Sequence, residues 1–128
     1  MTTPKLLVPN VAVVLNRDLL FGSRLRSALA TLGMEARFVS NTDRFVDAIR
    51  TGGKTTAIGV LDMNGHISWD ILGEVLHASD AGPPTLAFGP HVDIENRRAA
   101  KAAGITRIVS NGQFHADMAG LIDRYRRR

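Results

Sequence analysis

The sequence predicts an α/β fold, in which one doubly wound sheet of five parallel strands carries five helices on its two faces. Two kinds of segment alternate five times along the 128 residues: a short apolar run, then a longer stretch with apolar residues at helical spacing. The apolar runs lack in-and-out alternation, which is typical of strands buried on both faces. This alternation favours parallel pairing through right-handed crossovers.

The first two strand and helix units occupy the N-terminal part of the chain. A β-branched run at Val11 to Leu15 predicts the first strand, and Asp18 to Leu32 predicts an amphipathic helix that Gly33 ends. The second strand is expected at Arg37 to Val39 and the second helix at about Thr42 to Arg50.

The third unit and the fourth strand are separated by strong breakers. Ala57 to Leu61 is a third apolar run, and Ser68 to Ala78 has the apolar spacing of a third helix. The sequence Gly82-Pro83-Pro84 interrupts the chain, so we place the fourth strand after it, at Thr85 to Phe88.

The remaining elements follow in the same order. Asp93 to Ala103 is an Arg- and Ala-rich helix closed by Gly104, Ile105 to Val109 is the fifth strand, and Phe114 to Tyr125 is the final helix. We find no internal repeat, linker or low-complexity segment, so residues 1–128 are expected to form a single domain with its core at about 10–125.

Composition excludes several classes of function. The chain has no cysteine, which excludes disulfides, thiolate catalysis and cysteine-bound metal, and which fits the cytoplasm. No apolar stretch approaches the roughly 20 residues that span a bilayer, and residues 1–5 lack the apolar region of a secretory signal. We therefore expect a cytoplasmic protein that does not contact membranes.

The basic C-terminus raises a question about partners. The net charge is +4, and four arginines crowd the last five residues: Arg124, Arg126, Arg127 and Arg128. The favoured interpretation is a solvated helix end whose cations suit the helix dipole. A docking or nucleic-acid role is the alternative, and it would require a basic face elsewhere on the molecule as well.

Functional groups in such a sheet lie in the crevice beyond the carboxyl ends of the strands. The sequence places polar or turn-forming residues at four of these strand exits: Asn16, Arg17 and Asp18 after the first, Asp62, Met63 and Asn64 after the third, Gly89, Pro90 and His91 after the fourth, and Ser110, Asn111 and Gly112 after the fifth. Asp62, in the stretch "VLDMNG", is the acid that ends an apolar run there.

From Val11 to Tyr125 the pattern resembles the CheY-like receiver domain of two-component response regulators. The likeness rests on the five-fold strand and helix order, on "VVLNRDLLFGSRLRSALATLG" as first strand and helix, and on Asp62 closing the third strand. The stretch "AAKAAGITRIVSNGQF" fits the end of the fourth helix and the fifth strand. The resemblance implies a flavodoxin-like sheet with strand order 2-1-3-4-5.

The family's functional positions are only partly kept. By resemblance, the phosphoacceptor falls on Asp62, and the acid pair that holds Mg²⁺ falls on Asn16 and Arg17. The hydroxyl position falls on Gly89 and the Lys position on Asn111. Replacing two acids with an amide and a guanidinium should weaken a Mg²⁺ site severely. Gly89 has no side chain and Asn111 has no positive charge to offer to the phosphoryl oxygens. The resemblance therefore implies a degenerate receiver.

Several residues keep two interpretations at this point. Asp18 is favoured as a helix cap, and Asp18 with Asp62 makes only a weak candidate for Mg²⁺. Ser110 could offer a hydroxyl from a neighbouring position, and Arg17 could pair with Asp62. His91 is either a crevice donor or, as we favour, a solvated loop residue. The four histidines build no metal motif.

We conclude from the sequence that the protein is a stand-alone pseudo-receiver and not an enzyme. It would bind another signalling protein, such as a kinase or an output regulator, through Asp93 to Tyr125 with Arg97, Arg98 and Lys101 as charged contacts. A second copy of the chain is a further candidate partner, and no direct nucleic-acid contact is expected. The alternatives are a working phosphoacceptor at Asp62, a nucleic-acid-associated protein acting through its basic end, and a flavodoxin-like cofactor binder.

Overall fold

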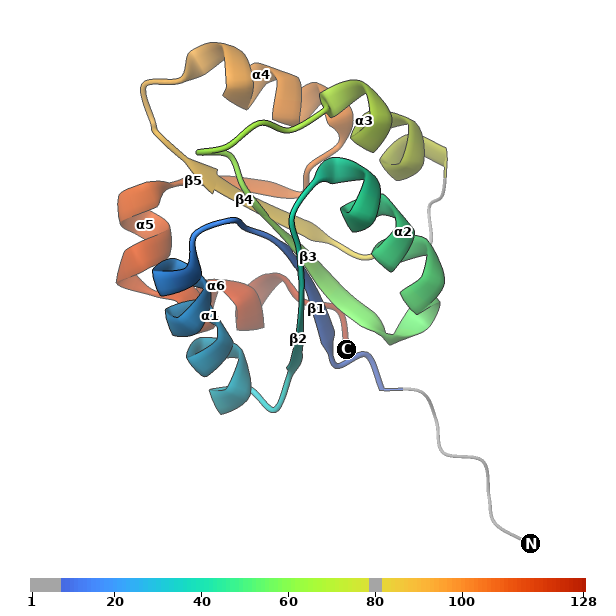
Figure 1. Ribbon diagram of the computed structural model, residues 1–128, viewed down its shortest axis with the longest axis vertical. Helices are drawn as coiled ribbons and strands as arrows, with labels where there is room; N and C mark the ends of the chain where they lie inside the picture. Colours follow the sequence, from blue (N-terminus) through green and yellow to red (C-terminus); the bar gives the residue numbers. More distant parts are fainter. Residues whose placement is uncertain (1–7, 79–81) are drawn as a thin grey trace, which may run out of the picture.

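The computed structural model describes residues 8–78 and 82–128, so the N-terminal residues in which no secretory signal was found lie outside the described part. Five parallel strands form one sheet in the order β2-β1-β3-β4-β5 (Figure 1). The predicted fold class and strand order are confirmed. The strands are β1 Val11–Leu15, β2 Glu35–Val39, β3 Thr56–Asp62, β4 Thr85–Gly89 and β5 Arg107–Ser110.

Helices connect the strands and cover both faces of the sheet. They are α1 Leu19–Thr31, α2 Thr42–Gly52, α3 Trp69–Ala78, α4 Ile94–Ala103, α5 Asn111–Ala116 and α6 Met118–Tyr125, with a 3-10 turn at Gly53–Thr55. Helices α1, α5 and α6 lie on one face and α2, α3 and α4 on the other (Figure 1). The result is a three-layer arrangement with the sheet in the middle.

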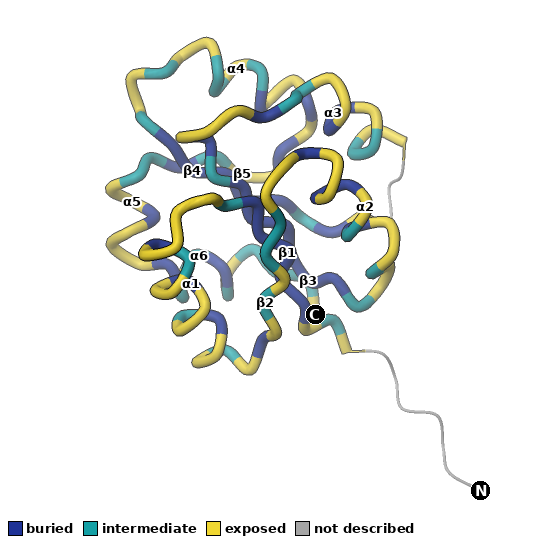
Figure 2. The backbone as a smooth tube through the Cα atoms, viewed as in Figure 1, coloured by how far each residue is buried: buried dark blue, intermediate teal, exposed yellow. Residues whose placement is uncertain are grey.

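The core has two halves because neighbouring strand residues point to opposite faces of the sheet. Val14 and Phe88 pack with the α1, α5 and α6 side, whereas Val13 and Ala87 pack with the α2, α3 and α4 side. Every residue of β1 and β4 is buried, which explains why their sequences show no alternation (Figure 2).

The final helix was predicted wrongly as one element from Phe114 to Tyr125. It consists of two helices, and α5 begins three residues earlier, at Asn111. Ser110 and Gln113 form a capping box that starts α5, and the Asp117 carboxylate accepts from the Gly120 N–H to start α6. Each cap satisfies backbone N–H groups at the start of a helix, so α6 begins as a separate helix after Asp117.

The C-terminal arginines are partly built into the fold. Arg127 donates from Nε to the Thr56 carbonyl oxygen at 2.8 Å and from Nη2 to that of Gly53 at 2.9 Å. Arg126 donates to the Leu32 carbonyl oxygen and pairs with Asp123 at 2.8 Å. The solvated-tail interpretation is therefore wrong for these two half-buried arginines.

The exposed pair at the same terminus behaves differently. Arg124 is exposed and lies 5.7 Å from the centre of the Tyr125 ring, while Arg128 is exposed and reaches the Asp123 carboxylate at 3.2 Å.

No helix within the described part of the chain is long and apolar enough to cross a bilayer.

Candidate functional site

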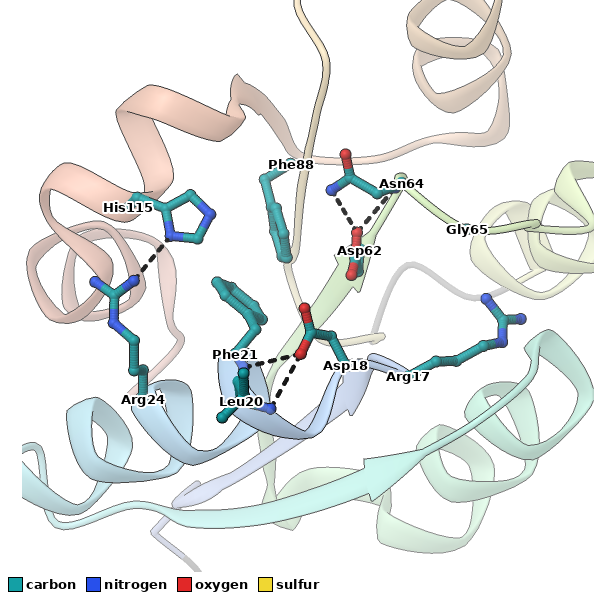
Figure 3. Close-up of a pocket in the computed structure, with 10 residues that line it drawn as sticks. All are labelled: Arg17, Asp18, Leu20, Phe21, Arg24, Asp62, Asn64, Gly65, Phe88 and His115. Carbon is teal, nitrogen blue, oxygen red and sulfur yellow. Dashed lines mark hydrogen bonds between the residues drawn. The ribbon is translucent and has the colours of Figure 1, made fainter.

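The strand exits meet at one edge of the sheet, as the topology requires. Asp62 is the last residue of β3 and lies opposite Phe88 of β4, and Gly89 lies opposite Ser110 of β5. Beside Asp62, a cavity of about 560 Å³ opens between α1 and α5 (Figure 3). Its lining residues come from four segments of the chain: Arg17, Asp18, Leu20, Phe21, Arg24, Asp62, Asn64, Gly65, Phe88 and His115.

The Asp62 carboxylate is half-buried and accepts three hydrogen bonds from neutral donors. Asn16 Nδ2 donates to Oδ2 at 2.9 Å. The backbone N–H and the side-chain Nδ2 of Asn64 both donate to Oδ1, at 2.8 and 2.7 Å (Figure 3). Within the described residues Asp62 has no salt bridge, so amide groups alone compensate its charge.

The amides around Asp62 form one oriented chain. The Asp18 N–H can only donate, and it binds Asn16 Oδ1 at 3.0 Å, which turns the Asn16 Nδ2 toward Asp62. The Asn64 Nδ2 donates to Asp62 and, at 3.0 Å, to the Asn111 Oδ1. The Asn111 Nδ2 donates in return to the Asn64 Oδ1 at 2.9 Å. The single carboxylate thus fixes the orientation of three amide side chains and ties β3 to the start of α5.

Arg17 does not pair with Asp62, contrary to the hypothesis from the sequence. Its Nη2 donates to the His66 carbonyl oxygen at 3.0 Å, and its Nη1 lies where a Cβ on Gly65 would be. The guanidinium therefore covers the turn after β3 and points away from the carboxylate (Figure 3).

Asp18 caps α1, as predicted. Its Oδ1 accepts from the N–H groups of Leu20 and Phe21, at 3.0 and 3.2 Å, which satisfies two donors of the first helical turn (Figure 3). Asp18 therefore both lines the cavity and stabilises the first turn of α1.

Other groups occupy the two strand exits to which the resemblance assigns a hydroxyl and a cation. A Cβ on Gly89 would lie 2.9 Å from the Cβ of Met63, so the space for a side chain at this strand exit is already occupied. The Ser110 Oγ accepts from the Gln113 N–H at 3.1 Å as a helix cap. Asn111, at the Lys position, turns its amide to Asn64.

Some residues of the cavity were missed, and one expected residue lies elsewhere. Phe21 and Phe88 form its apolar base, and Arg24 Nη1 lies 3.4 Å from His115 Nδ1 at its rim (Figure 3). The Ser110-x-x-Gln113 capping box could have indicated that α5 begins at 111 and carries position 115 to this edge. His91 is exposed between β4 and α4 and does not line the cavity.

The donor set does not fit a Mg²⁺ ion. Mg²⁺ requires oxygen ligands in near-octahedral geometry. Both Asp62 oxygens already accept N–H groups, Asn16 presents its nitrogen to the site, and Oδ1 of Asp18 caps α1. Within residues 8–78 and 82–128, no cluster of three or more acidic or histidine side chains could hold a metal.

Comparisons with known proteins agree with the architecture. No family model and no curated protein matches the sequence. Chemotaxis protein CheY4 of Vibrio cholerae matches in structure with a TM-score of 0.72 at 12% identity, over 92% of this chain and 99% of that one. A receiver domain protein from Clostridium thermocellum gives 0.73 at 15% identity over 91% and 93%. The CheY-like protein TadZ from Pseudomonas aeruginosa PAO1 gives 0.68 at 16% identity over 91% and 98%.

The three structural matches cover 91–92% of this chain. The protein therefore has the fold of CheY-like response-regulator receiver domains, which confirms the resemblance drawn from the sequence. At such low identities the likeness concerns the fold, and the site must be interpreted from its own residues.

Proposed function

We propose that this protein is a receiver-like signalling module that acts by binding a partner protein, without Mg²⁺-dependent phosphoryl transfer. The observation that carries the proposal is the Asp62 carboxylate, whose two oxygens accept three amide N–H groups. In this role the pocket holds β3 and α5 together, and it is not the site of a reaction.

The chemistry of phosphoryl transfer supports this interpretation. The reaction depends on positioned cations that stabilise charge on the phosphoryl oxygens. Arg17 binds the carbonyl of His66, and Asn111 replaces a cation with a neutral amide. A protein with this pocket is a binding module and not an enzyme, and we place it in the cytoplasm as a single domain.

The partner surface we propose lies on α4. Ile94, Arg98 and Lys101 are exposed and recur at the spacing of one helical face, and Ile94 is 60% exposed. Val92, 72% exposed, lies two residues before α4 and adds exposed apolar surface next to the start of the helix. A mixed apolar and cationic face suits an acidic region of a signalling protein, such as a kinase or an output regulator.

Arg97 fits this surface less well than its neighbours. It is half-buried, and its Nη1 is a buried atom without a hydrogen-bond partner in the described part of the chain. We therefore assign the charged contacts to Arg98 and Lys101. A second copy of the chain is an alternative occupant of the same face.

The experiment that tests the proposal is intact-mass spectrometry after incubation with acetyl phosphate and Mg²⁺. We expect no phosphoryl adduct on the wild-type protein, the same result as for the Asp62→Asn control. An adduct on the wild type alone would overturn the proposal and establish Asp62 as a phosphoacceptor. The half-buried position of Asp62 at the cavity mouth makes that alternative the second candidate function.

A nucleic-acid role through the basic end has less support. Arg126 and Arg127 bind backbone carbonyls of the protein itself, which leaves Arg124 and Arg128 as the exposed cations of that end. If the basic end binds nucleic acid, removal of the charges of Arg124 and Arg128 should weaken DNA binding in a salt-dependent way, and unchanged binding across a salt titration would exclude this role.

A further inference from the structure

We propose that Asn64 is a site of spontaneous chemical modification, at which the side-chain amide is lost and a carboxylate takes its place beside Asp62. Asparagine is a thermolabile residue, and the backbone nitrogen that follows it can attack its side chain. A glycine in the next position leaves that nitrogen unshielded. The chain contains this pair twice at the carboxyl edge of the sheet, as Asn64-Gly65 and Asn111-Gly112.

Two features of the turn at Asn64 favour the reaction once its amide releases the hydrogen bonds to Asp62 and Asn111. Asn64 and Gly65 are both exposed in the turn after β3, and the Gly65 N–H makes no hydrogen bond to the part of the chain that the structure describes. The Arg17 guanidinium lies directly against Gly65 (Figure 3). A fixed cation at this place stabilises negative charge that develops as the nitrogen attacks.

The reaction balances with water as the only co-reactant. The Gly65 nitrogen attacks Cγ of Asn64, the new C–N bond closes a five-membered succinimide, and the Cγ–Nδ2 bond breaks. The proton of the Gly65 nitrogen leaves with Nδ2 as ammonia. Water then opens the ring at Cγ to give Asp, or at the backbone carbonyl to give the isoaspartyl linkage.

The product changes the pocket that the proposed function describes, and this consequence rests on that proposal. Asn64 Nδ2 donates to both Asp62 and Asn111, so its loss removes both hydrogen bonds. A second carboxylate within hydrogen-bond distance of Asp62 repels it. The link between β3 and the start of α5 is therefore weakened with time.

The second pair supplies a matched internal control. Asn111 and Gly112 are the first two residues of α5, and the Ser110 and Gln113 capping box holds this turn. Ring closure changes the backbone angles of the asparagine, so it requires the first turn of α5 to open. The same dipeptide is thus placed in a turn at position 64 and in a capped helix at position 111.

The test is peptide mapping by mass spectrometry of the full-length protein after incubation at mildly alkaline pH. Conversion adds about 1 Da per event, as Asp or isoaspartyl product. In the folded protein we expect Asn64 to convert about tenfold faster than Asn111, because position 111 must wait for local opening of the helix. In urea the two positions should convert at equal rates.

Two variants sharpen the result. Gly65→Ala should slow conversion at position 64 by about tenfold, because a Cβ shields the nitrogen and displaces Arg17, while position 111 stays unchanged. Equal rates at the two positions in the folded protein, or no conversion at Asn64, would overturn the inference. Asn64→Asp, a mimic of one product, should lower the melting temperature relative to Asn64→Gln, and an unchanged temperature would remove the proposed consequence.

The outcome is independent of the phosphorylation experiment. A phosphoryl adduct on Asp62 is much heavier than the change at Asn64, and the two map to different residues. Failure of the proposed function therefore leaves the rate comparison between Asn64 and Asn111 intact, and failure of the rate comparison leaves the absence of an adduct intact.

Discussion

Arg127 at the amino edge of the sheet and Asp62 at the carboxyl edge are bound by opposite kinds of polar partner. At the amino edge, cationic side chains bind neutral acceptors, since Arg127 donates to the carbonyls of Thr56 and Gly53. At the carboxyl edge, neutral amides bind one anion, Asp62. The comparison teaches that two C-terminal arginines stabilise the amino edge, while neutral amides hold the Asp62 carboxylate at the carboxyl edge.

The largest effect is expected at the amino edge. Arg127→Ala removes the two charged hydrogen bonds that the guanidinium donates to the carbonyl oxygens of Thr56 and Gly53. The free energy of unfolding should fall by about 3 kcal/mol. Urea denaturation followed by circular dichroism measures this. Arg128→Ala, at an exposed position with one surface pair, should change it by about 0.5 kcal/mol or less. Equal losses from the two variants would contradict the division between built-in and exposed arginines.

At the carboxyl edge, filling the glycine position should be the most costly change. Gly89→Ser introduces a Cβ 2.9 Å from that of Met63 and should destabilise the fold by about 1–3 kcal/mol, without creating Mg²⁺-dependent phosphorylation. Thermal unfolding and intact mass measure the two expectations. Gly112→Ala is the matched control, because that glycine lies in a helix and a Cβ there would meet only the Ser110 Oγ, at 3.9 Å, so the change should be neutral or stabilising.

Removal of the anion tests the amide chain itself. Asp62→Ala leaves the donors of Asn16 and Asn64 without their acceptor and should cost about 1–2 kcal/mol in unfolding free energy. Asp62→Asn keeps one acceptor oxygen and should cost less. Amide hydrogen exchange at the start of α5 should rise in Asp62→Ala, and unchanged protection there would show that the chain of amides does not connect β3 to α5.

The smallest effect is expected for the guanidinium that the sequence had suggested as a partner of Asp62. Arg17→Ala removes one exposed hydrogen bond to the His66 carbonyl and should cost about 0.5 kcal/mol. Chemical denaturation is sufficient to measure it. A loss as large as that of Asp62→Ala would indicate that the two side chains act as a pair.

The strands were predictable because burial on both faces requires continuous apolar runs in the sequence. The predicted range of β1 agrees with the structure at both ends, whereas β5 runs from Arg107 to Ser110 instead of Ile105 to Val109. An edge strand of this kind has fewer buried residues, so its apolar pattern marks its ends poorly. The break at Asp117 was missed because apolar spacing continues through both α5 and α6.

The sequence predicted which strand exits meet, but it missed Arg24 and His115 at the cavity and did not predict the contacts. Asp62 ends a strand and Asn16 and Asn111 follow strands, and parallel pairing alone brings strand exits to one edge. Which atoms meet there depends on short distances between segments far apart in the chain. Arg17 illustrates the limit, because only the position of the His66 carbonyl decides where its guanidinium binds.

The sequence by itself predicted the order of the strands, the sheet between two helical layers, and the residues that stand at the positions marked by the resemblance, among them Asn16, Arg17 and Asn111. These follow from apolar periodicity and residue identity, which are local properties. The tertiary structure alone decided that amides saturate Asp62, that Met63 fills the space at Gly89, and that Arg126 and Arg127 join the fold. The physical reason is that hydrogen bonds and steric fit depend on ångström-scale distances that arise only when the strands and helices are packed together.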